Sequence, residues 1–493
     1  MNSTTTGSEF KRGLGLFDST MIVVGSMVGS GIFIVSADIS RTLGSTGYLL
    51  LTWIVTGLMT VIAALSYGEL AGMMPRVGGQ YAYLREAYNP FIGFLYGWTL
   101  FLVIQTGTIA AVAMAFGKFT AVLFPMLGEQ NILLKAWGLH ISAAQCTAIA
   151  SLVILTGINM FGLQEGKIVQ NLFTSTKIIA LTGLIVLGII FQRNTQAFES
   201  NFSSLWNATS AVTAGGIVKI LPLSGLALFA AFGAAMVGSL FSSDAWNNIT
   251  FTAGEVKNPR RNIPLSLALG VGIVTLIYIL CNVSYLSVLP LSGNPQSAAA
   301  AGRGIQFAAS DRVGTAAAEQ IFGISGALIM AILIMISTFG CNNGLILAGA
   351  RVSYAMAKDG LFFKAAGKLN RKSVPGAALI VQGIWAAILC LSGTYGNLLD
   401  YVIFAVLIFY ILTIGGVFIL RKKLPDADRP YKTFGYPVLP ALYIVLAAAI
   451  SIDLLIYKPQ YTWPGLIIVL LGIPVYFLWR KKVSGKQQMV NSK

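Results

Sequence analysis

Long runs of apolar residues, separated by short polar segments, recur along almost the whole chain. These runs cover residues 17–40, 47–73, 91–124, 143–161, 168–191, 222–252, 264–289, 323–356, 375–393, 397–420, 437–457 and 463–480. An α-helix needs about 20 residues to cross the hydrocarbon core of a bilayer, and each run is near or above that length. The pattern therefore predicts an all-α polytopic membrane protein with about twelve transmembrane helices.

The first apolar run has a weak point in its middle. The stretch Gly25–Phe33 contains Gly25, Gly29, Gly31 and two serines. A glycine inside a helix costs about 1 kcal/mol relative to alanine. Any backbone groups released there must bond to protein, water or a ligand, because lipid offers no partner. Two interpretations are open for the segment by itself: a helix-packing face between Gly25 and Gly29, or a break in the helix.

The sixth apolar run carries polar residues at a comparable place. The stretch Phe241–Asn248 contains two serines, Asp244 and two asparagines. A carboxylate at membrane depth is costly and usually marks a substrate or ion pathway. The alternative is that Asp244 lies near the membrane surface or pairs with a lysine. Interrupted segments at matching positions of two five-helix halves are typical of inverted-repeat transporters, so we predict discontinuous helices 1 and 6.

A second charge is predicted inside the membrane, on the fifth helix. Lys177 lies about ten residues past the start of that apolar run, which is too deep for its ammonium to reach the interface easily. It therefore needs carbonyl partners, a carboxylate, or loss of its proton. We favour a functional role over a purely structural one.

Composition and charge fit this picture. Of the 493 residues, 56% are hydrophobic and only 10% are charged, where a soluble domain has about 25% charged residues. The mean hydropathy is +0.77. The formal charge of +16 comes largely from basic residues in one set of loops, such as Lys257 to Arg261 and Arg421 to Lys423. The positive-inside rule explains this asymmetry without nucleic acid and places both termini in the cytoplasm.

Other residues limit the chemistry that is possible. The single histidine, His140, lies in a predicted loop, and the four cysteines lie inside apolar runs without a CxxC pair. We therefore expect neither a metal site nor a disulfide framework. The apolar run after the polar first sixteen residues is too long for a signal-peptide core, so no cleavable signal peptide is expected.

Two loops have features of their own. We expect a turn at 75–83 and a short interfacial helix at 84–88, because aromatic residues gather there. The long, alanine-rich segment 292–320 is either a helical lid or a flexible linker.

The chain resembles the amino acid–polyamine–organocation transporters, and within them the L-type amino acid transporter branch. The matching stretches follow the same order and spacing almost end to end. They are Gly25–Phe33, Gly78–Tyr83, Phe173–Leu181, Phe241–Ile249, Val256–Pro264, Ser337–Gly340, Ala350–Arg351, Lys358–Gly360, Val374–Ala377, Leu424–Pro425 and Arg429–Lys432.

The resemblance implies a five-plus-five inverted repeat followed by two further helices. The expected divisions are a cytoplasmic tail at 1–16, a first repeat at 17–191, an outer loop at 192–221, a second repeat at 222–420, a cytoplasmic loop at 421–436, helices 11 and 12 at 437–480, and a cytoplasmic tail at 481–493.

The family also implies roles for individual residues. An α-amino acid is the substrate, with its carboxylate held at the unwound stretch that includes Gly29, by Ser30 and by Gly31. Its ammonium is held by carbonyls near Met27, Phe241 and Asp244. Phe241 matches an aromatic gate and Asn247 a polar pocket position. Lys177 matches the lysine that, in sodium-independent members, stands where related symporters bind sodium and bridges helices 1 and 8.

Departures from the family pattern affect the expected substrate range and partners. Ser243-Asp244-Ala245 replaces an aromatic-then-glycine run and resembles members that handle cationic amino acids or cystine as well. The outer loop 124–142 lacks the cysteine that links animal members to a glycoprotein, so no disulfide-linked heavy chain is expected.

The sequence favours a sodium-independent exchanger of neutral amino acids in a cytoplasmic (inner) membrane, without a cofactor. A proton-coupled symporter and an exchanger that also accepts cationic amino acids remain alternatives. A nutrient-sensing receptor is a distant one, and no nucleophile–base pair suggests an enzyme.

Overall fold

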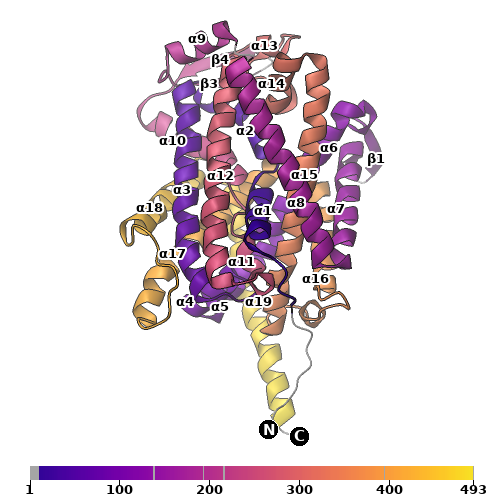
Figure 1. Cartoon of the computed structure of the whole chain (residues 1–493), viewed down its shortest axis with the longest axis vertical. Coiled ribbons are helices and arrows are strands. Elements are labelled where there is room, and N and C mark those ends of the chain that lie inside the picture. The colour runs from indigo at the N-terminus through magenta and orange to yellow at the C-terminus, as the bar shows by residue number, and fades with distance from the viewer. Residues whose placement is uncertain (1–9, 137–138, 192–193, 215–216, 393–394, 492–493) are drawn as a thin grey trace.

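The architecture is a bundle of long helices, seen in a computed structural model of the chain (Figure 1). The structure describes residues 10–136, 139–191, 194–214, 217–392 and 395–491. Within them, eleven helical spans are long and apolar enough to cross a membrane, and Gly376–Ser392 is a shorter apolar helix. These segments coincide with the twelve predicted runs, so the predicted all-α membrane fold is confirmed.

The membrane-crossing helices are as follows. They are α1 (Leu16–Met27) with α2 (Gly31–Leu43), α3 (Thr46–Met73), α5 (Pro90–Thr99) with α6 (Gln105–Leu123), α7 (Ala143–Phe161), α8 (Leu163–Val186), α10 (Gly225–Ser242) with α11 (Asn248–Phe251), α12 (Pro259–Val288), α15 (Ile324–Lys358), α16 (Gly376–Ser392), α17 (Tyr395–Lys423), α18 (Val438–Tyr457) and α19 (Pro459–Asn491). The last helix continues through the segment expected to be a C-terminal tail.

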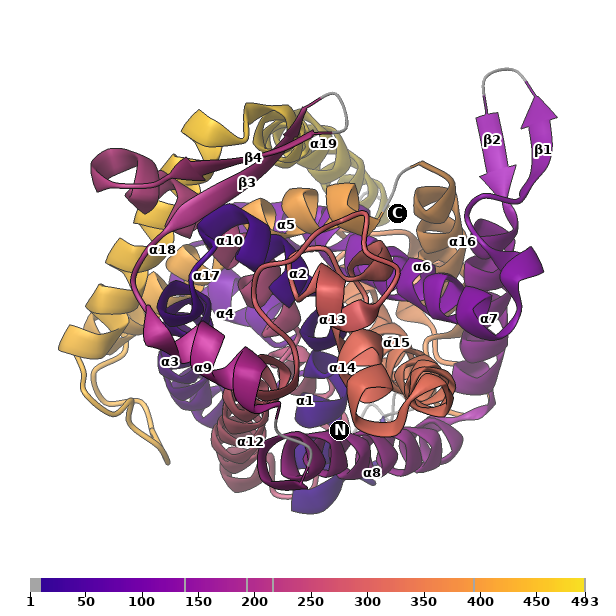
Figure 2. The same ribbon diagram turned by 90° about the horizontal axis from the view of Figure 1, so that it is seen from above.

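Burial separates central helices from those that face lipid. In the apolar window of α1 and α2, 89% of the residues are buried, whereas the value for α8 is 33%. Most of the exposed residues of α8 are apolar, for example Leu172 and Ile179. A view along the bundle shows α2 near its middle and α7 and α18 at its rim (Figure 2). The interrupted first helix is therefore surrounded by protein, where its free backbone groups can find partners.

The two ends of the bundle differ (Figure 1). At one end lie α9 (Thr195–Ser203), α13 (Ala300–Arg303), α14 (Val313–Phe322) and the hairpin of β3 (Thr209–Ala214) and β4 (Ile217–Pro222). A second hairpin, β1 (Ile132–Ala136) with β2 (Leu139–Ser142), precedes α7 and contains His140. The other end carries α4 (Gln80–Ala87), the start of α1 and the end of α19. We call it the terminal end.

The segment 292–320 forms a helical cover and not a flexible linker. A Cβ on Gly314 of α14 would lie 2.8 Å from the ring of Phe33 in α2. Arg41, near the end of α2, forms an ion pair of 2.7 Å with Asp311 and donates to the carbonyl of Gln306 at 2.8 Å. These contacts fix the cover against α2, the half of the first membrane helix that lies away from the terminal end.

The interfacial helix begins earlier than predicted. The structure places α4 at Gln80–Ala87, whereas the sequence suggested 84–88. The reason is the turn at Gly78 and Gly79, whose φ angles are +96° and +42°. Both values favour glycine, so the turn ends at Gly79 and the helix starts directly after it.

At the terminal end, the segment before α1 pairs with the segment after α11. The N–H groups of Gly13 and Leu14 donate to the carbonyl of Glu255 at 2.9 and 3.0 Å, and the N–H of Lys257 donates to Leu14 at 2.8 Å. The Glu255 carboxylate forms a two-pronged ion pair with Arg351 of α15, with N–O distances of 2.9 and 3.2 Å. Their side chains are 2% and 1% exposed. This junction joins three separate parts of the bundle.

Replacing Arg351 with methionine should destabilise the protein, because it leaves the Glu255 carboxylate buried without its partner. Breaking such a pair costs about 3–5 kcal/mol, whereas replacing both partners with apolar residues is often nearly neutral. We expect Arg351→Met to lower the thermal unfolding temperature in detergent, and Glu255→Leu/Arg351→Met to recover much of it. Arg371→Gln, an exposed arginine at the same end, is the control. An Arg351→Met variant as stable as the control would contradict this account.

Candidate functional site

The first membrane helix is interrupted where the sequence predicts. The helical part α1 ends at Met27 and α2 begins at Gly31, and the N–H of Gly29 donates to the carbonyl of Met27 at 2.9 Å. The break leaves the C-terminal carbonyls of α1 and the N-terminal N–H groups of α2 inside the bundle. A helix N-terminus favours an anion and a C-terminus favours a cation.

Gly25 and Gly31, on either side of this break, lie against different neighbours. A Cβ on Gly25 would lie 2.0 Å from the Gln170 side chain of α8, so Gly25 serves helix packing. A Cβ on Gly31 would lie 1.9 Å from Oγ of Ser242. Gly31 therefore permits close contact between the two interrupted helices. Gly25 thus fits the interpretation as a helix-packing position, and the gap between α1 and α2 fits the interpretation as a helix break.

The sixth membrane helix is also interrupted where the sequence predicts. The helix α10 ends at Ser242, and α11 begins at Asn248. Between them, the N–H of Asp244 donates to the carbonyl of Phe241 at 3.2 Å, and Ala245 has a φ of +63°. This left-handed conformation costs a non-glycine residue about 1–2 kcal/mol. Such strain is typical of functional sites.

Tyr278 of α12 joins the two breaks. Its hydroxyl lies 3.0 Å from the carbonyl of Met27 and 3.0 Å from the carbonyl of Ser242. The tyrosine is 2% exposed. Sequence reasoning missed this residue, although a tyrosine in the middle of an apolar run signals a hydroxyl that needs a partner.

The side chains expected to bind substrate are all buried. Met27, Ser30, Phe241, Asp244 and Asn247 are between 1% and 8% exposed. The Met27 carbonyl already accepts from the N–H of Gly29 and lies within reach of the Tyr278 hydroxyl. Since a carbonyl has two lone pairs, a substrate ammonium at Met27 would compete with the Tyr278 hydroxyl.

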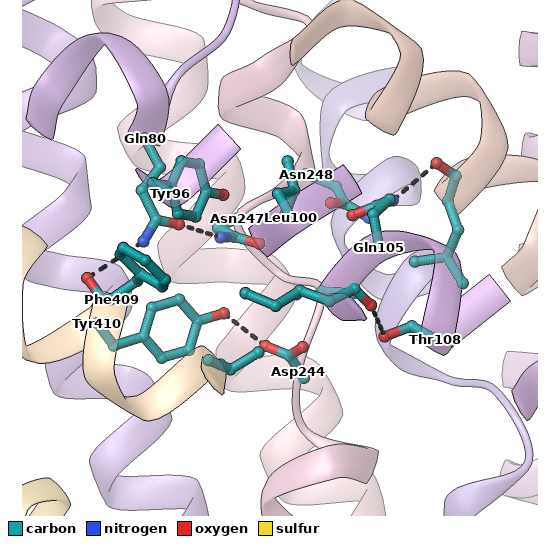
Figure 3. A pocket seen from close by; sticks show the side chains of 14 residues that line it. Gln80, Tyr96, Leu100, Gln105, Thr108, Asp244, Asn247, Asn248, Phe409 and Tyr410 are labelled. Atoms are coloured by element: carbon teal, nitrogen blue, oxygen red, sulfur yellow. Dashed lines mark hydrogen bonds between the residues drawn. The ribbon is translucent and has the colours of Figure 1, made fainter. Parts of the chain in front are cut away.

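A buried cavity lies beside the break in the sixth helix (Figure 3). The cavity is narrow, and its lining comes from α4, α5, α6, α15 and α17 as well as the break. Asp244 and Asn247 line it, whereas Phe241 and the stretch Met27–Gly31 are not among its lining residues. The structure thus brings two of the predicted site residues to this cavity.

Polar contacts organise the cavity wall. The hydroxyl of Tyr410 donates to Oδ1 of Asp244 at 2.5 Å, and Nδ2 of Asn247 donates to Oε1 of Gln80 at 2.9 Å. The Tyr96 hydroxyl and the Asn248 amide nitrogen are buried at this cavity and have no hydrogen-bond partner among the described residues. Buried polar groups normally have partners. These two groups are therefore available to a bound polar molecule.

A second cavity lies on the other side of the Asp244–Tyr410 contact. This cavity is also narrow, and its lining includes Trp246 and Tyr443. Asp244 and Tyr410 line both cavities. Their hydrogen bond therefore forms part of the wall between the two spaces. The sequence drew attention to Asp244 but carried no signal for Tyr410.

The Lys177 side chain extends to the break in the first helix. Its Nζ donates to the carbonyls of Gly25 at 2.7 Å and Val28 at 2.6 Å, and to Ser337 of α15 at 3.4 Å. The side chain is 1% exposed. Within the described residues, no carboxylate forms an ion pair with it. The ammonium is thus held by backbone carbonyls of two helices.

Metal-binding side chains do not cluster within the described residues. These residues contain no group of three or more His, Cys, Asp or Glu side chains that could hold a metal ion. The cysteines Cys146, Cys281, Cys341 and Cys390 are free thiols.

Comparison with known proteins identifies the family. A family model described as amino acid permease matches residues 14–477. The b(0,+)-type amino acid transporter 1 of Homo sapiens is 28% identical over 491 residues, covering 97% of this chain and 91% of the relative. The large neutral amino acids transporter small subunit 2 of Homo sapiens is 30% identical over 489 residues, covering 97% of this chain and 82% of the relative. The transporter resemblance drawn from the sequence is confirmed: this multi-pass membrane protein belongs to the amino acid permease family.

Proposed function

We propose that this permease is a sodium-independent exchanger of neutral L-amino acids that works by alternating access. The observation that carries the proposal is the position of Lys177. Its ammonium donates to carbonyls of both α1 and α15, the two helices that the family resemblance assigns to a sodium site in related symporters. A permanently tethered cation fills the charge requirement of that place, so a sodium ion is not needed.

The two helix breaks support a clamp for an α-amino acid. The N-terminus of α2, with Gly29, Ser30 and Gly31, suits the carboxylate, because N–H groups and the helix dipole favour an anion. The carbonyls of Phe241 and Asp244 suit the ammonium, and Met27 contributes once the Tyr278 hydroxyl releases it. Phe241 acts as the gate, and Asn247 orients the substrate from the adjoining cavity.

Wider features of the proposal follow from the family pattern and charge. The two five-helix repeats are residues 17–191 and 222–420. The terminal end faces the cytoplasm, and the membrane is the plasma membrane. The protein works without a disulfide-linked heavy chain, because the loop 124–142 contains no cysteine.

A second candidate is an exchanger that also accepts cationic amino acids. The specific observation in its favour is Asp244, a buried carboxylate that lines both cavities. In a site with low dielectric, a substrate cation beside this carboxylate would gain a strong charge-assisted hydrogen bond.

The exchange proposal is tested with protein reconstituted in liposomes. Uptake of labelled alanine or leucine should be much faster into vesicles loaded with unlabelled amino acid than into empty ones, and replacing sodium with choline should not change it. Equal uptake into loaded and empty vesicles would rule out obligate exchange. Acceleration by an inward pH gradient in empty vesicles would favour the proton-coupled symporter.

Removing the Lys177 ammonium should slow turnover more than it weakens binding, because the ammonium joins helices that move relative to each other. Lys177→Met loses charge-assisted hydrogen bonds worth about 1.5–3 kcal/mol each, so the maximal exchange rate should fall by roughly tenfold or more. Thr176→Ala, a change at the neighbouring residue of α8, is the control. A Lys177→Met protein that exchanges amino acids at the wild-type rate would remove this residue from the mechanism.

Asp244→Asn keeps the shape of the side chain and its ability to accept from Tyr410, but removes the charge. If the carboxylate contacts cationic substrates, arginine exchange should fall by roughly tenfold or more, since losing one partner of a buried charge pair costs about 2–5 kcal/mol. Neutral exchange should change much less. Parallel uptake of labelled arginine and leucine measures both effects. Wild-type protein that does not transport arginine would leave only the neutral exchanger.

A further inference from the structure

A groove lies at the terminal end, where α3, α12 and the segment between α17 and α18 meet. Its volume is about 570 Å³. Arg260, Arg261 and Leu265 line it from α12, and Asp428 and Tyr431 line it from the connecting segment. It shares no lining residue with the two cavities at the helix breaks. The groove therefore belongs to a different site.

The groove is a fixed part of the fold. Glu69 of α3 accepts two hydrogen bonds from Arg421, at 2.9 and 2.7 Å, and one from the N–H of Thr433 at 2.7 Å. A Cβ on Gly68 would lie 3.1 Å from the ring of Tyr431. These contacts hold the connecting segment against α3, so the groove needs no rearrangement to form.

The arginines at and near the groove differ in their partners. Arg260 forms an ion pair of 2.7 Å with Asp428, and both side chains are mostly exposed. Arg429 and Arg421 both form ion pairs with Glu69, at 3.4 and 2.7 Å. Arg261, in contrast, is exposed and its guanidinium has no hydrogen bond or ion pair with any residue that the structure describes. Charge complementarity therefore favours an anion at Arg261.

Beyond the groove, the exposed face of α12 is apolar and has a gap at Gly272, and we call this face the furrow. Leu265, Leu269 and Leu276 are 38%, 47% and 60% exposed. Between them, a Cβ on Gly272 would meet no atom within 4 Å, which marks open space at the helix surface. Arg261 and Gly272 are eleven residues apart, or about 16 Å along the helix. That length is close to half of the roughly 30 Å hydrocarbon core.

We propose that this groove binds one anionic phospholipid from the leaflet at the terminal end. Its phosphate lies at Arg261, and one acyl chain follows the furrow past Gly272. A polar anion alone would leave the apolar furrow unused, and a zwitterionic lipid would leave the Arg261 charge without net compensation. An arginine near an anionic headgroup raises the affinity for that lipid by about fivefold, which sets the selectivity between lipid classes.

The test is native mass spectrometry of the purified full-length protein with equal amounts of dioleoyl phosphatidylglycerol and dioleoyl phosphatidylcholine. Wild-type protein should retain the phosphatidylglycerol preferentially. Arg261→Gln should reduce that preference by about fivefold. Arg371→Gln, which removes an exposed arginine in the segment before α16, should leave it unchanged.

A second pair of variants tests the furrow without touching the arginines. Gly272→Leu should reduce phosphatidylglycerol retention, because its side chain occupies the path of the acyl chain. Gly183→Leu is the matched control, since a Cβ on that α8 glycine also meets no atom within 4 Å. Equal retention of both lipids by wild-type protein, or unchanged preference in Arg261→Gln, would overturn the proposal. So would complete displacement by millimolar inorganic phosphate, which would indicate an ion site only.

Discussion

The interior of this protein depends on one constraint: backbone groups freed at depth in a membrane must be satisfied by protein. The two interrupted helices free such groups at Val28–Ser30 and Ser243–Asn247. Lys177 supplies donors to the carbonyls of Gly25 and Val28, and the Ser337 hydroxyl lies 3.1 Å from the carbonyls of Val28 and Gly29, to one of which it donates at a time. Intact helices thus use their side chains to stabilise broken ones. Replacing any of these donors affects the shape of the break as well as its charge.

The same constraint explains why the breaks meet. Tyr278 is within reach of a carbonyl at the end of α1 and one at the end of α10. A single hydroxyl has only one proton to donate, so it satisfies one carbonyl at a time. In the binding mode that we propose, a substrate ammonium at Met27 would leave the hydroxyl free to turn wholly to Ser242. The proposed ammonium position and the connection between the two breaks therefore share this hydroxyl.

Much of the fold could be predicted because the bilayer limits the possible structures. Run length predicted the crossing helices, and the glycines and Asp244 predicted both breaks. Tyr410, Gln80 and Tyr96 could not be predicted as cavity residues, because their roles depend on which helices lie side by side. The early start of α4 was missed because it depends on the positive φ of Gly79, which a pattern of apolar positions does not reveal. Local periodicity can be read directly from the sequence, whereas contacts between helices that are far apart along the chain depend on how the helices pack.

The contacts at the two ends of the bundle have a consequence for alternating access. The half of the first helix far from the terminal end is held by the Arg41–Asp311 ion pair, and the half at the terminal end by the backbone bonds of Leu14 to Glu255 and Lys257. The described structure therefore has both ends fastened around the buried breaks. Opening toward the terminal end must separate Leu14 from Glu255, while the Glu255–Arg351 pair is buried and costly to break. Since Glu255 follows α11, the least costly movement leaves α11 with α15 and releases α1 alone.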